Sequence, residues 1–135
     1  MASKGSYLHY TDTTWSERGE ILGKNTSEQF GWSVSVNGDG TIIAAGAPEN
    51  DDGPGTNSGA VRIYQWNDVS WNQLGSDILG SFNEERSGGA EGASSVSLNH
   101  TGNIVAIGSY RNYENGGYHG AVSYTHLTLP TNREV

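Results

Sequence analysis

Two stretches of the chain repeat one another. FGWSVSVNGDGTIIAAGA, from Phe30 to Ala47, aligns without a gap with GASSVSLNHTGNIVAIGS, from Gly92 to Ser109, at an offset of 62 residues. Flanking blocks repeat as well, since Gly59-Ala60-Val61 returns as Gly120-Ala121-Val122. Likewise, Trp15 to Gly23 (WSERGEILG) returns as Trp71 to Gly80 (WNQLGSDILG) with one insertion. The unit therefore has roughly 55 to 60 residues, a period typical of repeat architectures, and about two copies are present.

The repeated blocks have the patterns of β-strands. SVSV (33–36) alternates small polar with apolar residues, and AVRIYQW (60–66) also alternates. TIIAAGA (41–47) and NIVAIGS (103–109) are continuous apolar runs, which are typical of strands buried on both faces. Turn residues separate these runs, and a looser fourth strand is expected at 71–79. Four antiparallel strands form one blade of a β-propeller. We therefore predict an all-β fold with almost no helix, a partial β-propeller of about two four-stranded antiparallel blades.

The repeat frame also divides the chain. We place a propeller fragment at residues 1–122, with a partial blade at 5–23, a blade at 30–79 and a partial blade at 92–122. After Val122 the frame predicts a sequence such as Arg-Ile-Tyr-Gln-Trp, but residues 123–135 read SYTHLTLPTNREV. This tail resembles the translated sequencing-adapter tails that contaminate conceptual translations, and a genuine divergent terminus is the alternative. Because no apolar stretch follows Met1, we expect no signal peptide here and interpret Met1 as not the native start.

Composition excludes several classes of function. Asp and Glu number 15 against 7 Lys and Arg, which gives a net charge of −8, so nucleic acid is not an expected partner. The absence of Cys excludes disulfides, thiolate metal sites and Cys nucleophiles. No apolar run approaches the roughly 18 residues of a membrane span, so we expect no membrane insertion.

At FGWSVSV, GTIIAAGAP and GAVRIYQW the chain resembles FG-GAP repeat proteins, whose repeat builds the seven-bladed head of integrin alpha chains. Phe30-Gly31 stands at the FG position and Gly46-Ala47-Pro48 at the GAP position. The second copy departs from the motif, with Gly92-Ala93 for FG and Gly108-Ser109-Tyr110 for GAP. The resemblance covers about residues 5 to 122 and implies a propeller within a larger extracellular or cell-surface protein.

The resemblance also implies a calcium loop just before the GAP strand. The side-chain ligand positions of that loop fall on Ser35, Asn37, Asp39 and Ile43 in the first copy and on Ser97, Asn99, Thr101 and Val105 in the second. Calcium takes six to eight oxygen ligands, several of them carboxylates. Two of the four ligands are lost in the first copy, and the second offers no carboxylate. We therefore expect no cofactor and interpret Asn37 and Asp39 as remnants of a calcium loop that serve the turn.

Two regions are candidates for ligand contact. The loop Pro48–Gly59 gathers Glu49, Asp51 and Asp52, which would suit a cation or polar ligand, although a solvated acidic turn is the favoured interpretation. Trp32 aligns with Ser94, so it is the least structural of the four tryptophans and our first candidate for a contact residue. Trp15 and Trp71 occupy equivalent positions, and Trp66 is close by, so packing between blades is favoured over sugar stacking.

No catalytic pattern is present. The histidines have no zinc spacing, no nucleophile elbow precedes a helix, and Glu84, Glu85 and Glu91 lie in an expected surface loop. Two glycosylation sequons begin at Asn25 and Asn99, and they support a secretory context only slightly.

These observations lead to one functional hypothesis and three rivals. We expect a non-catalytic recognition or adhesion module, with a protein or glycan ligand and with further propeller blades in the full-length chain as its partners. One rival is a carbohydrate-binding module that uses Trp32 and the Pro48–Gly59 loop. Another is the propeller appendage of a secreted hydrolase. The third is a chain without a function of its own, which would associate or aggregate through unpaired strand edges.

Overall fold

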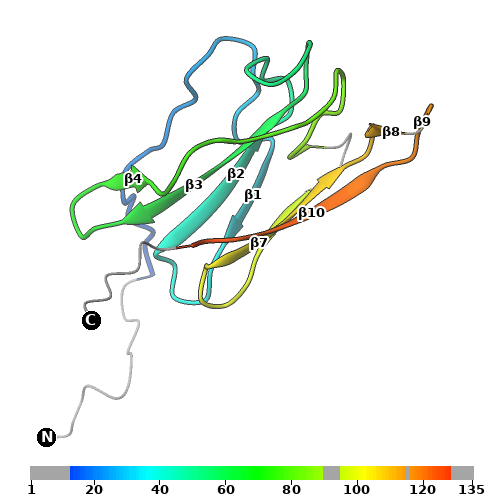
Figure 1. Cartoon of the computed structure of the whole chain (residues 1–135). Helices are drawn as coiled ribbons and strands as arrows, with labels where there is room; N and C mark the ends of the chain where they lie inside the picture. Colours follow the sequence, from blue (N-terminus) through cyan, green and yellow to red (C-terminus); the bar gives the residue numbers. More distant parts are fainter. Residues whose placement is uncertain (1–12, 90–94, 115, 129–135) are drawn as a thin grey trace, which may run out of the picture.

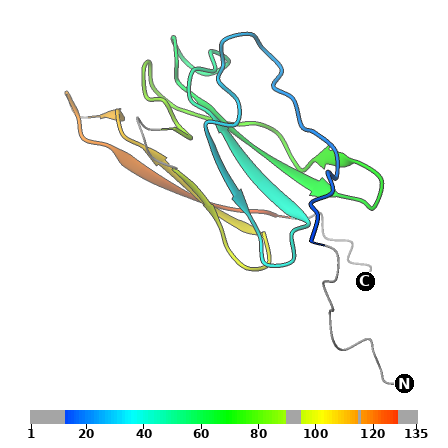
Figure 2. The same ribbon diagram turned by 180° about the vertical axis from the view of Figure 1, so that it is seen from behind.

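The computed structural model describes residues 13–89, 95–114 and 116–128, and every regular element in these ranges is a β-strand. All but two of the described strands form two antiparallel sheets that lie face to face, and the other two form a separate hairpin (Figure 1; Figure 2 shows the reverse side). The all-β prediction is confirmed, and the two sheets are partial propeller blades. Each sheet corresponds to one copy of the sequence repeat, which we call the first and the second unit.

The first sheet contains β1 to β5. β1 (Ser33–Val36), β2 (Ile42–Ala47) and β3 (Ala60–Trp66) pair in chain order. The free edge of β3 pairs with two short strands, β4 (Trp71–Gln73) and β5 (Ile78–Leu79). The looser fourth strand expected at 71–79 is therefore present in two pieces. It breaks between them because Gly75 takes a positive φ of 80°.

The second sheet has three strands in the described part of the chain. β6 (Val96–Leu98), β7 (Ile104–Ser109) and β10 (Ala121–His126) pair in that order, so β10 lies at an edge. A separate hairpin of β8 (Tyr113–Glu114) and β9 (Gly117–Tyr118) connects β7 to β10. β10 continues past the expected blade boundary at residue 122. Residues 123–126 keep their register with β7, and their Tyr and Thr are residues that favour strands.

Alternation along the strands decides which side chains lie between the sheets. The core comprises Ala44 and Val61 from the first sheet and Val96, Val105 and Ile107 from the second. Small serines let the two backbones approach. The Leu98 N–H donates to Ser35 Oγ at 3.0 Å, and Ser33 Oγ donates to the Gly88 carbonyl at 2.6 Å. The two units therefore pack through an apolar core that is flanked by hydrogen bonds.

The loop that precedes each sheet follows one template. In the first unit, the N–H groups of Lys24 and Asn25 donate to Glu28 Oε2. In the second unit, the N–H groups of Ser81 and Phe82 donate to Glu85 Oε2 in the same way. Glu28 and Glu85 are thus equivalent, 57 residues apart, and each carboxylate holds the turn before it.

This template corrects the position of the FG motif in the second unit. The N–H of Gly31 donates to Gly46 O and that of Gly88 donates to Gly108 O, and both glycines have positive φ angles. Ser87-Gly88 is therefore the structural counterpart of Phe30-Gly31. The gapless alignment chose Gly92-Ala93, which lies outside the described residues, because the extra five residues of the second unit follow the turn rather than precede it.

The same register changes the counterpart of Trp32. The Trp32 N–H donates to Gln29 O and the Gly89 N–H donates to Arg86 O, both at 3.2 Å. Gln29 and Arg86 share a positive φ, near 59° and 56°. Trp32 is thus equivalent to Gly89 rather than to Ser94.

Candidate functional site

Two loops join into one ordered surface at one end of the sheets. They are Pro48–Gly59 and Ser81–Gly89, and together we call them the loop end (upper part of Figure 1). Backbone hydrogen bonds connect them. The N–H of Glu84 donates to Thr56 O at 2.8 Å, that of Arg86 to Asn57 O at 3.0 Å and that of Ser87 to Ser58 O at 2.9 Å. The two loops therefore stabilise each other in one fixed arrangement.

Charged side chains cross between the two loops. Arg86 Nη1 donates to Glu49 Oε1 at 2.7 Å, and Arg86 Nη2 donates to Glu84 Oε2 at 3.1 Å. All three side chains are about a quarter exposed, and Arg111 approaches Glu84 at 3.9 Å. The hydrogen bond that Arg86 donates to Glu49, and then the one that it donates to Glu84, raise the pKa of Arg86 against the effect of burial. Glu49, a predicted ligand residue, is thus part of an ion-pair network.

Asp51 and Asp52 shape their own loop. Asp51 Oδ1 accepts the Asn57 N–H at 2.7 Å, and Asp52 Oδ2 accepts a hydrogen bond from the Asn50 side chain at 3.1 Å. Both residues remain exposed. Over residues 13–89, 95–114 and 116–128, no group of three His, Asp or Glu side chains is arranged to hold a metal ion. The acidic trio therefore does not converge on one point, although two of its carboxylates face solvent.

Trp32 borders the loop end. Trp32 is 45 % exposed, and its side chain and that of Pro48 both lie close to Gly89. A Cβ atom at Gly89 would stand 3.1 Å from Trp32 Cδ1, so the glycine leaves room for the indole. The structure therefore brings Trp32 and the acidic loop to the same region of the surface.

The loop that would carry calcium does not fit the ion. Asn37 Oδ1 accepts the N–H groups of Thr41 and Ile42, both at 3.0 Å. Asp39 Oδ1 accepts the Thr41 N–H at 3.1 Å and the Thr41 hydroxyl at 2.6 Å. These oxygens close the turn, and Asp39 is the sole carboxylate among residues 37–41. One carboxylate with an occupied oxygen does not make the oxygen-rich shell that calcium requires.

The two glycosylation sequons differ in geometry. Asn25 is exposed in its loop. Asn99 repeats the role of Asn37, since its Oδ1 accepts the N–H groups of Gly102 and Ile104. Its Nδ2, the atom that would carry a glycan, donates to Asn103 at 2.8 Å. A glycan at Asn99 would therefore disrupt the turn, whereas the exposed side chain of Asn25 could carry one.

The tryptophans divide in a way that corrects one expectation. Trp71 packs on Trp66 with ring centroids 5.3 Å apart, and its Nε1 donates to Arg18 O at 3.0 Å. Trp15, its sequence equivalent, is fully exposed, which contradicts its expected role in packing. The reason is local, because Trp71 lies in β4 beside β3, whereas residues 13–23 form no strand.

A buried ion-pair network lies on the outer face of the first sheet. Arg62 from β3 donates to Glu28 Oε1 at 2.8 Å and to Glu28 Oε2 at 3.0 Å, and its Nε donates to Asp77 at 2.8 Å. The side chains of Arg62 and Glu28 are 0 % and 2 % exposed. Sequence reasoning missed this network. The available signal was an arginine within an apolar strand, a position that demands a buried partner.

The motif residues make two kinds of contact, one within the first unit and one between the two units. Phe30 contacts Tyr64 edge-on at 6.2 Å, and the Arg62 guanidinium lies 5.3 Å from the Phe30 ring centre. Gly46 passes the carbonyl of Gly88 so closely that a Cβ would overlap that oxygen. Ala47 is fully buried. The FG residue thus covers the ion pair, and the GAP glycine permits contact between units.

Comparison with known families agrees with this geometry. The family model described as FG-GAP repeat matches residues 15–64. Residues 15–64 are thus similar to an FG-GAP repeat. The match runs from the segment before the first sheet to β3, and so includes Phe30, Gly46 and the Glu28–Arg62 pair. Searches of curated proteins and of solved structures each gave no match.

The buried pair of Glu28 and Arg62 predicts a specific response to acid. Burial acts to raise the pKa of Glu28, but hydrogen bonds from Arg62, Asn50 and two backbone N–H groups outweigh it and lower the pKa to about 2. A carboxyl with a depressed pKa stabilises the fold fully above its ordinary value of 4.5, and this stability is lost as the pH falls towards 2.

We therefore expect the free energy of unfolding to decline between about pH 4.5 and pH 2, and the Glu28→Gln variant to lose part of this slope. Urea unfolding at a series of pH values measures it. The matched control is Glu20→Gln, which changes an exposed residue and should keep the wild-type slope. Parallel pH profiles for wild type and Glu28→Gln would contradict this assignment.

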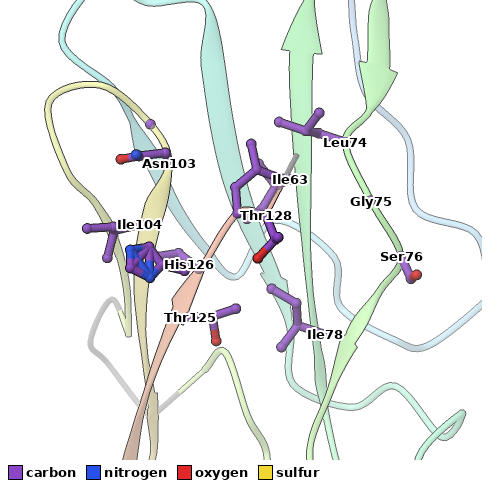
Figure 3. A pocket seen from close by; sticks show the side chains of 13 residues that line it. Ile63, Leu74, Gly75, Ser76, Ile78, Asn103, Ile104, Thr125, His126 and Thr128 are labelled. Atoms are coloured by element: carbon purple, nitrogen blue, oxygen red, sulfur yellow. The ribbon is translucent and has the colours of Figure 1, made fainter. Parts of the chain in front are cut away.

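A cavity of about 260 Å³ separates the sheets at the end opposite to the loop end (Figure 3). Ile63 and Ile78 line it from the first sheet, and Ile104, Val105 and Thr125 line it from the second. The volume is below the range of about 300–1,000 Å³ that is typical of sites for drug-sized ligands. We assign this space to packing between units rather than to ligand binding.

Proposed function

We propose that this chain is a non-catalytic recognition module of an FG-GAP propeller and that it binds a protein or glycan through the loop end. The observation that carries the proposal is the loop end itself. Its two loops are fixed by backbone hydrogen bonds and by the ion pairs of Arg86, and both project from a sheet scaffold. Fixed loops on a rigid scaffold are a common location for binding residues.

The chemistry of the loop end favours a polar partner. Asp51 and Asp52 are exposed, and the chain carries a net charge of −8. A negatively charged surface repels other acidic surfaces and favours association with a basic or polar one. We therefore propose a partner with basic or hydrogen-bonding groups that contact the Pro48–Gly59 loop.

Location in an extracellular or cell-surface protein is part of the proposal. FG-GAP repeats are found in extracellular proteins and are typically non-catalytic propeller modules. Within the described part of the chain, no helix is long and apolar enough to cross a membrane. Further blades in a longer chain would complete the propeller and present the loop end beside the loops of neighbouring blades.

Carbohydrate recognition is the second candidate, and one observation favours it. Trp32 presents a half-exposed indole next to the acidic loop. An aromatic face beside polar groups is an arrangement that suits a sugar ring, because the ring packs on the apolar side while hydroxyls reach polar atoms.

The test measures binding of the purified chain to immobilised extracellular-matrix proteins and to a glycan array. The double variant Asp51→Asn/Asp52→Asn removes two charges but keeps an oxygen that can accept the loop hydrogen bonds. We expect it to weaken binding about tenfold, which corresponds to roughly 1.4 kcal/mol. The control is Asp68→Asn, at the β3–β4 turn on the opposite end of the first sheet, and it should bind like wild type.

If Trp32→Ala abolishes binding to the glycan array but leaves binding to protein ligands unchanged, the carbohydrate candidate is supported. Binding that is unchanged in Asp51→Asn/Asp52→Asn, or no binding to either panel, would contradict recognition through the loop end.

A further inference from the structure

The second sheet exposes a face that the first sheet buries. Ser35, Ala44 and Val61 of the first sheet face the second unit. Their equivalents are Ser97, Ala106 and Val122, as the repeat and the strand registers show. Val122 is 74 % exposed, and Tyr124 beside it is similarly exposed. The outer face of the second sheet is thus a copy of a surface that is built to receive another sheet.

The first sheet exposes the complementary face. Val34 and Val36 are exposed, and Ile43 is half-buried beside them. Their equivalents in the second unit are Val96, Leu98 and Val105, which pack in the interface between the units. The outer face of each unit is therefore equivalent in sequence to the face that the other unit buries in the internal interface.

Among the residues that the structure describes, a segment with a strand-forming sequence lies beside this face without forming a strand. Residues 15–23 repeat the sequence of β4 and β5 but form no strand, and Leu22 is 69 % exposed. Arg18 and Ile21 of this segment border a groove of about 320 Å³ whose other wall includes Val34 and Ala45. In the internal interface, their equivalents Leu74 and Ile78 line the cavity of Figure 3 together with Val105, the equivalent of Ile43.

The second sheet supplies the matching edge. Its order is β10-β7-β6, so β10 lies at the edge where β4 and β5 pair with β3 in the first sheet. Strand edges with free N–H and C=O groups are templates for pairing with another chain.

In a longer chain, further blades would cover these two faces. For the 135-residue chain by itself, we propose that a second copy docks its second sheet on the outer face of the first sheet, and that residues 15–23 of the first copy pair with its β10. The register follows from β5, where Leu79 pairs with Ala60 and Ile78 with Val61. Across the two copies, Leu22 then pairs with Ala121 and Ile21 pairs with Val122. The contact is head-to-tail, so it extends into a chain of copies or closes into a ring.

The register gives a covalent test, because the chain contains no cysteine. The variants Leu22→Cys and Ala121→Cys are purified separately, mixed and exposed to mild oxidant. Opposed residues of antiparallel strands have Cα atoms about 4.5–5.5 Å apart, a separation that a disulfide spans. We expect a linked dimer of twice the 14.4 kDa chain mass in the mixture and little in either variant alone.

The register control pairs Leu22→Cys with Thr125→Cys, four residues along β10 from Ala121. At about 3.3 Å per residue this places the two sulfurs too far apart to join. Equal cross-linking in this control mixture would overturn the proposed pairing.

The mass in solution provides a second arm that needs no cross-link. Val36→Glu blocks the outer face of the first sheet, and Val122→Glu blocks the outer face of the second sheet. Both side chains are exposed, so each variant should still fold, and a thermal melt checks this. Light scattering should show wild-type assemblies, monomers for each variant alone, and a dimer for their mixture. Association of either variant alone would show that the contact is symmetric. A monomeric wild type would show that a second copy does not cover these faces. Either result would overturn the proposal.

Discussion

Replacement of Arg62 by methionine is expected to lower the free energy of unfolding by about 3–5 kcal/mol. The guanidinium is fully buried and donates to both oxygens of Glu28 and to Asp77. Methionine retains most of the side-chain volume, so the dominant effect is a Glu28 carboxylate that stays buried without its cation. Urea unfolding at neutral pH, followed by tryptophan fluorescence, measures the change.

Two controls separate charge from packing. Lys24→Met removes a cation that contacts Asp77 at 3.2 Å from a side chain that is 49 % exposed, and it should cost less than about 1 kcal/mol. The double variant Glu28→Gln/Arg62→Met removes both charges and should recover part of the loss, because an apolar or neutral replacement of a whole buried pair is often tolerated. A loss below about 1 kcal/mol in Arg62→Met would contradict a buried, paired carboxylate.

Replacement of Gly46 by alanine is expected to cost about 3 kcal/mol, at the upper end of the usual effect of overpacking. The new Cβ would overlap the Gly88 carbonyl and approach Ser33 Oγ. A backbone carbonyl cannot rotate away as a side chain can, and Ser33 donates to this same oxygen. The substitution therefore pushes the two units apart at the GAP position.

The second unit offers a matched control. Gly108 is the repeat equivalent of Gly46, but a Cβ there would meet only the Ser95 side chain at 3.3 Å and its carbonyl at 3.8 Å. Gly108→Ala should therefore change the free energy of unfolding by less than about 1 kcal/mol. Equal losses at the two glycines in thermal or urea unfolding would show that the GAP glycine is not needed for contact between units.

The sequence repeat predicted the strands well because each strand pattern occurs twice in the chain, once in each unit. The alternation at Ser33–Val36 and the apolar run at Ile42–Ala47 each recur 62 residues later, and both copies form strands. The turn residues also kept their function, since Asn37 and Asn99 close equivalent hairpins. Repetition of a local signal therefore compensated for the absence of any single strong motif.

Loop register was not predictable in the same way. Gln29 and Arg86 share a left-handed backbone conformation but have different side chains, so no sequence identity reveals that they are equivalent. The gapless offset of 62 placed the second FG position five residues too late. Hydrogen bonds from Gly31 and Gly88 reveal the true register because they report backbone geometry directly.

The buried network was missed because its members are distant in sequence. Glu28 and Arg62 are 34 residues apart and come from a loop and a strand. The acidic residues of the Pro48–Gly59 loop attracted attention instead because they cluster in sequence, yet Glu49 pairs with Arg86 and the aspartates hold their own turns. Proximity along the chain thus marked candidate ligands, whereas the strongest electrostatic contact depended on tertiary structure.

Methyl NMR tests most directly whether the two repeat units pack through complementary faces, which is the arrangement on which the account rests. Nuclear Overhauser effects should join the methyl groups of Ala44 and Val61 in the first unit to those of Val96, Val105 and Ile107 in the second. Contacts between copies would instead involve Ala106 and Val122 with Val36 and Ile43, so the two interfaces give separate signals. Cross-peaks within the first set are the predicted result, and folded sheets that lack them would contradict the account.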